Sequence, residues 1–146
     1  MTRMTWKAKT SRVNRAAAPT PSSAAAAAYC RAVDNWPRSW MGLPEDVPPG
    51  EQLLACFRPF LEQLASSSLS PKTIRKHVDN LWLLGGELIR ELHEDPGRRK
   101  APASRLLNDR ISPDGGPLIH NGSEEDQLAF DSTCRKLCRF LTNPQR

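Results

Sequence analysis

The chain has 146 residues and a formal charge of +5, a length that suffices for one modest hydrophobic core. No apolar run approaches the ~20 residues of a membrane-spanning helix, so we expect a cytoplasmic protein with no membrane partner. Four cysteines in a reducing compartment do not predict a disulfide scaffold.

The positive charge is concentrated at the N-terminus. Residues 1–28 contain five of the 21 Lys and Arg residues and no acid, which leaves 16 basic and 16 acidic side chains in the remainder. This segment is rich in Ala, Ser, Thr and Pro and has no helical or strand period, so the sequence predicts a disordered basic tail over 1–28. Clustered cations attract nucleic acid or an anionic surface, but a leader without a partner has the same composition.

Residues 29–146 are predicted to form a single helical domain. Between Tyr29 and Pro49 we expect a short helix or irregular arm whose Trp36 and Trp40 pack onto the domain, and their exposure at a partner surface is the alternative. A helix is then predicted from Pro48 to the serine run 66–68. Its buried face has apolar residues at spacings of three and four: Leu53, Phe57, Phe60, Leu61 and Leu64. Pro59 should kink or restart this helix.

A second long helix is the best-supported element. Ser70 can cap it, Pro71 fits its first position, and Pro96-Gly97 stops it. Its apolar stripe comprises Ile74, Val78, Leu81, Gly85, Leu88 and Leu92, widened by Trp82 and Ile89. Gly85-Gly86 indicates either a close helix–helix crossing or a helix broken in two at this point. The cations of 98–100 are placed in the loop that follows.

Two further helices are expected in the C-terminal third. A short one is predicted near Ala103–Ile111, and 112–122 is predicted to be a loop because it is rich in Gly and Pro. Ser123 and Asp126 resemble a capping box before a last helix. Since no stretch alternates as a strand does, we expect an all-α bundle of four to five helices.

Metal binding and catalysis have little support in the sequence. Cys134 and Cys138 lie four residues apart on one helical face, but that face is apolar and therefore favours buried thiols over metal ligands. No Gly-rich phosphate loop or nucleophile motif is present. We therefore expect no metal site, no cofactor and no catalytic residue, and His77 is interpreted as a packing residue at the edge of the buried face.

Cations at the start of the second long helix are the better lead. Lys72, Arg75 and Lys76 share one exposed face with Asp79. Cations in a first turn oppose the helix dipole, and phosphate oxygens would offset that cost. A solvated face with ion pairs to other helices is the alternative.

The segment FLEQLASSSLSPKTIRKHVDNLWLL, from Phe60 to Leu84, resembles the core-binding (SAM-like) domain of tyrosine recombinases, the phage-integrase family. The matching pattern is a first helix with an FLxxL-type end, then Leu-Ser-Pro-x-Thr, then a second helix. The resemblance implies a helical bundle that clamps double-stranded DNA with basic helix faces. It makes Lys72, Arg75 and Lys76 candidate DNA contacts, and charge alone adds Arg98, Arg99 and Lys100.

The chemistry of that family is not expected here. It requires an Arg, a His-x-x-Arg motif and a tyrosine nucleophile downstream of the module, whereas Tyr29 is the only tyrosine and lies upstream. The leading hypothesis is therefore a non-catalytic DNA-binding protein, accessory to or a relic of a mobile element involved in DNA integration or recombination. The alternative is a helical protein-interaction or regulatory module that binds no nucleic acid.

Overall fold

The structure is a computed structural model that describes residues 32–120 and 122–142, so the predicted tail over 1–28 lies outside the described residues. The described part is all-α, as the sequence predicted, with one isolated β-bridge between Ser112 and Gly115. Its helices are, in chain order, α3 (Trp36–Trp40), the 3-10 helix η1 (Pro44–Asp46), α4 (Val47–Ala65), α5 (Pro71–Glu94), the 3-10 helix η2 (Pro96–Lys100), α6 (Ala103–Arg110) and α7 (Glu124–Thr142).

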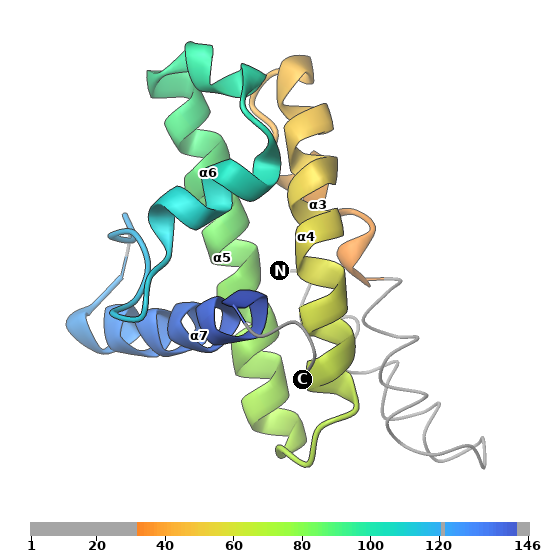
Figure 1. Cartoon of the computed structure of the whole chain (residues 1–146), viewed down its shortest axis with the longest axis vertical. Helices are drawn as coiled ribbons and strands as arrows, with labels where there is room; N and C mark the ends of the chain where they lie inside the picture. The colour runs from red at the N-terminus through yellow and green to blue at the C-terminus, as the bar shows by residue number, and fades with distance from the viewer. Residues whose placement is uncertain (1–31, 121, 143–146) are drawn as a thin grey trace.

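Helix α5 is the central element of the bundle (Figure 1). It runs antiparallel beside α4, to which the short segment 66–70 joins it, and it also contacts α3, η2 and α7. Helix α7 crosses α5, and α6 packs on α4. Every other long element is therefore positioned against α4 or α5.

Helix α4 continues through its internal proline. Pro48 lies in the first turn, where a missing amide donor costs nothing, and the helix begins one residue before it. The sequence left a restart at Pro59 open, and that alternative is wrong because Pro59 lies inside the continuous helix. The helix ends where predicted, with the amide of Ser66 donating to the carbonyl of Glu62.

Helix α5 confirms the predicted start signal. The amide of Thr73 donates to the Oγ of Ser70 at 3.1 Å, and Pro71 occupies the first helical position. The helix is not broken at Gly85-Gly86. Instead, the six-membered ring of Trp40 lies against Gly85, where a Cβ would come within 2.1 Å of the indole. The predicted break is therefore wrong, and the close contact at Gly85 is made by the Trp40 side chain of α3.

The segment 98–100 corrects a sequence prediction. It was expected to be loop, but it forms the last part of η2, in which the amide of Arg98 donates to the carbonyl of Asp95 at 3.0 Å. Pro96 explains the difference, since its fixed φ suits the first turn of a helix as well as the end of the preceding one.

Helix α7 begins with the predicted capping box. The amide of Ser123 donates to the carboxylate of Asp126 at 3.0 Å, and the amide of Asp126 donates to the hydroxyl of Ser123 at 3.1 Å. Farther along, Cys134 is buried, as expected for a thiol on an apolar face, and burial raises its pKa to about 12.

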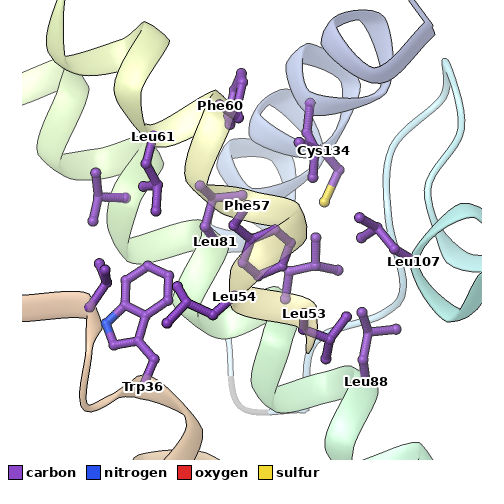
Figure 2. Close-up of a cluster of buried hydrophobic side chains, with 14 of the residues drawn as sticks. Trp36, Leu53, Leu54, Phe57, Phe60, Leu61, Leu81, Leu88, Leu107 and Cys134 are labelled. Atoms are coloured by element: carbon purple, nitrogen blue, oxygen red, sulfur yellow. The ribbon is translucent and has the colours of Figure 1, made fainter. Parts of the chain in front are cut away.

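The buried side chains of α3, α4, α5, α6 and α7 form one hydrophobic cluster (Figure 2). Phe57 and Phe60 of α4 are fully buried at its centre, with Leu81 of α5 beside them. Trp36 and Trp40 are also buried, which confirms the packing interpretation. No helix in the described residues has the length and apolar character needed to cross a membrane.

The two adjacent glycines provide a matched test of this packing. We expect Gly85→Ala to lower the free energy of unfolding by about 1–3 kcal/mol, because the new methyl group must displace the Trp40 ring. A Cβ at position 86 meets Trp40 only at 3.6 Å, so Gly86→Ala should raise stability by up to about 1 kcal/mol through helix propensity. Urea unfolding of both variants measures the difference, and equal effects would contradict the proposed contact.

Candidate nucleic-acid interface

The predicted cations at the start of α5 lie together at one end of the molecule. Lys72 and Lys76 are exposed and Arg75 is partly buried. The connection between α4 and α5 is at the lower end of the view in Figure 1, below the crossing with α7, so the first turns of α5 project past that crossing. We call Lys72, Arg75 and Lys76 the basic cluster.

The basic cluster is not neutralised by the acids described around it. None of the ion pairs between residues 32–120 and 122–142 includes Lys72, Arg75 or Lys76. The Nε of Arg75 is buried and has no hydrogen-bond partner in this part of the chain. The ion pairs to acids on other helices that the sequence left open are therefore absent from the described structure.

A cation that the sequence did not indicate lies close to this cluster. Lys136 of α7 and Lys76 of α5 both lie near His77, and their charges add to the lowering of its pKa. Sixty residues separate the two lysines in sequence, and only the crossing of α5 and α7 brings them together. No spacing rule along the chain could have predicted this neighbour.

The second predicted group of cations, 98–100, does not join the first. It follows the C-terminus of α5, so the length of that helix places it about 30 Å from the basic cluster. Arg98 donates to the carboxylate of Asp109 at 3.2 Å, and Arg99 donates to that of Asp46 at 2.6 Å. Both arginines therefore have ion-pair partners within the fold, and their assignment as auxiliary DNA contacts stays a prediction. Lys100 is exposed and remains a prediction.

Asp46 is the best-satisfied buried charge in the described structure. Its side chain is fully buried, and its Oδ2 accepts from the amides of Gly42 and Leu43 at 2.8 and 2.9 Å. The Nε2 of His93 lies 2.7 Å from the same oxygen, while Arg99 occupies Oδ1. Burial alone would raise the pKa of Asp46, but the hydrogen bonds from Arg99, His93 and the two amides outweigh it and hold the pKa well below its ordinary value.

A buried polar network joins α5 to α7. The Nδ1 of His77 lies 2.7 Å from the hydroxyl of Thr133, and the Nδ2 of Asn80 donates to that hydroxyl at 2.9 Å and to the carbonyl of Ala129 at 3.2 Å. Burial lowers the pKa of His77 to about 4, with smaller contributions from the two lysines nearby. This histidine therefore packs in its neutral form at neutral pH, as the sequence indicated.

One face of α5 is not covered by the rest of the bundle. It forms the floor of an open groove of about 1100 Å³, which we call the α5 groove. Trp40 and Met41 contribute to one wall, and Ile119, His120 and Ala129 contribute to the other. Along its floor lie residues of both charge and apolar character: Lys72, Lys76, Asp79, Leu83, Gly86 and Arg90.

The histidines along the groove hold loops in place. The Nδ1 of His120 lies 2.7 Å from the carboxylate of Glu87, and the backbone amide of His120 donates to the same carboxylate at 3.2 Å. His93 is paired with Asp46 in the same way. Within the described residues, no three His, Cys, Asp or Glu side chains are grouped so that they could hold a metal ion.

Comparison with known proteins does not assign a family. No protein-family model matches the chain, and neither a curated protein nor a solved structure does so. The resemblance to recombinase core-binding domains therefore rests on the residues between Phe60 and Leu84 alone.

The His77 network makes stability depend on pH. In the unfolded chain this histidine titrates near 6.5 and in the folded protein near 4, so the unfolded state binds more protons between these values and stability falls as pH is lowered from 6.5 to 4. We expect a loss of roughly 3 kcal/mol from this residue. Denaturant unfolding of the wild type and of His77→Gln at several pH values measures it. Parallel pH curves for the two proteins would contradict the assignment.

Arg98 and Arg99 differ in their surroundings, which gives a second matched test. We expect Arg99→Ala to lower the free energy of unfolding by roughly 3 kcal/mol, because it removes a charged partner from a fully buried carboxylate. Arg98→Ala should cost less than about 1 kcal/mol, since both partners of its ion pair are partly exposed. Thermal or urea unfolding compares the two, and a larger loss for Arg98→Ala is the outcome that contradicts this account.

Proposed function

We propose that this protein is a non-catalytic DNA-binding protein that contacts the phosphates of double-stranded DNA with the first turns of α5. The observation that carries the proposal is the position of the basic cluster on a helix end that projects beyond the crossing with α7. Lys136 of α7 extends the positive charge across the boundary between the two helices.

Helix electrostatics favour an anion at this end. The positive end of the α5 dipole lies beside three cations, each of which raises the energy of the unbound helix by about 0.3–1 kcal/mol. Phosphate oxygens relieve this repulsion, since they interact favourably with the cations and with the positive end of the helix dipole. A binding site for a polyanion is expected to have such mutually repelling cations when no ligand is bound.

The shape of this end suits a duplex. A helix with its side chains is about 10–12 Å across, which is close to the ~12 Å width of the major groove of B-DNA. A projecting helix end can approach the phosphates that border such a groove, whereas a cation recessed among other elements could not. The cations of residues 1–28 would add sequence-independent phosphate contacts that weaken with salt.

The proposal excludes strand cleavage. His77 lies in a buried network, and His93 and His120 are each hydrogen-bonded to a carboxylate that holds a neighbouring segment. We also propose an accessory role in a mobile element and a cytoplasmic location, and both are inferred from the sequence.

Binding of a fluorescent duplex, measured by anisotropy at several salt concentrations, tests this function. If the basic cluster contacts three phosphates, Lys72/Arg75/Lys76→Ala should reduce the slope of log affinity against log salt by about 3. The matched control is Arg38/Arg105/Arg139→Ala, which removes three exposed cations elsewhere on the described surface and should change the slope little.

Removal of residues 1–28 separates the tail from the helical part. We expect the shortened chain to bind DNA more weakly than the full chain but still to respond to the basic-cluster substitutions. If the shortened chain loses all binding and the substitutions change nothing in the full chain, the tail alone binds DNA and the proposal is wrong.

A further inference from the structure

One of the exposed apolar side chains of the described residues, Met41, lines the α5 groove. Leu43 follows Gly42, which also lines the groove. Leu118 and Leu128 are exposed to 79% and 65%, and each is the sequence neighbour of a residue in the opposite wall. These four are the large hydrophobic residues with exposed side chains in this part of the chain.

The floor of the α5 groove allows another chain to approach α5 closely. Gly85 is explained by the Trp40 ring, but Gly86 is not, because a Cβ there would make only ordinary contact with Trp40. A glycine in a helix interior is unfavourable unless something requires the missing side chain. At position 86 the missing side chain lowers the floor between Leu83 and Arg90, where another chain can pack against the helix.

The groove has a surplus of positive charge. Four cations line it, Lys72, Arg75, Lys76 and Arg90, against three acids. Of these side chains, Arg90 lies 4.0 Å from the carboxylate of Glu87 in an ion pair whose arginine is half-exposed. Glu87 also contacts His120, and Asp126 accepts from the amide of Ser123. An occupant with exposed acids beside an apolar side chain therefore fits the groove best.

The chain itself carries such a surface. Leu128 lies on the side of α7 opposite its buried Phe130 and Leu137. Glu124 and Glu125 precede Leu128 by four and three residues, so these glutamates and Leu128 share one outer face of the helix. Both glutamates are exposed, and none of the ion pairs between described residues includes them. We call Glu124, Glu125 and Leu128 the α7 outer face.

We propose that two copies of this chain form a symmetric dimer in which the α7 outer face of each copy occupies the α5 groove of the other. Leu128 packs over Gly86 and against Leu83, and the two glutamates approach Arg90. The groove wall and the α7 outer face belong to the same part of α7. A single two-fold axis can therefore place the α7 outer face of each copy in the α5 groove of the other. The proposal does not depend on DNA binding.

Analytical ultracentrifugation over micromolar to millimolar concentrations tests the dimer. The wild-type mass should rise from one chain to two, and Leu83→Glu or Leu128→Glu should each weaken association at least about tenfold. Glu51→Lys and Arg105→Glu, exposed sites on α4 and α6, are the controls and should leave association unchanged. A wild type that stays monomeric throughout overturns the proposal, and so does a dimer that neither leucine substitution weakens.

A charge exchange identifies the surfaces directly. Arg90→Glu alone and Glu124→Lys/Glu125→Lys alone should each remain monomeric, because each places like charges across both contacts. An equimolar mixture of the two variants should recover the dimer, since every contact in the mixed pair is again between opposite charges. A chain that carries all three changes should recover it as well, which a variant that merely misfolded would not do. Failure of both recoveries overturns the assignment of the surfaces.

The same variants keep this inference separate from DNA binding. Leu128→Glu leaves the basic cluster intact, so its monomer should still bind duplex DNA with the salt dependence of the wild-type monomer. If Leu128→Glu abolishes association while DNA binding persists, the dimer proposal is supported independently. If DNA binding is absent from every variant but the charge exchange still restores the dimer, only the proposed function fails.

Discussion

The burial of α5 is the constraint on which the rest of the structure depends. Eleven of its 24 residues are buried, and they occupy about half of its circumference. One neighbouring helix cannot cover so wide a face. Helix α4 covers part of it, α7 crosses it, and α3 reaches it through Trp40. Part of the remaining half is the floor of the α5 groove, so the position of the groove follows from which faces the bundle had to bury.

Two buried polar clusters fix where those covering elements lie. Asp46 ties the segment before α4 to His93 at the end of α5 and to Arg99 in η2, and it is stable in the core only because its oxygens are all engaged. At the other crossing, His77 and Asn80 share the hydroxyl of Thr133. Hydrogen bonds are directional in a way that apolar contacts are not, so these clusters select one arrangement among several that would bury similar area.

Both proposals depend on how this arrangement distributes charged side chains over the surface. The residues after the tail are balanced in number, yet acids and bases are not distributed evenly among the surfaces. Asp46, Glu87 and Asp109 are engaged by partners from other segments, whereas none of the ion pairs between described residues includes Lys72, Arg75 or Lys76. A neutral body can therefore still present a cationic helix end and, on the outer face of α7, an acidic one.

The sequence by itself determined the long helices and most of their ends. Short-range signals suffice for these, because a capping residue, a proline in a first turn and an apolar period act within a few residues: Ser70, Pro71 and the box of Ser123 and Asp126 were all predicted. The tertiary structure alone decided the partners. It assigned Arg98 and Arg99 to carboxylates, placed Lys136 beside Lys76, and seated Trp40 on Gly85. These contacts join residues far apart in the chain, and their geometry follows from the packing of whole helices, which no local pattern encodes.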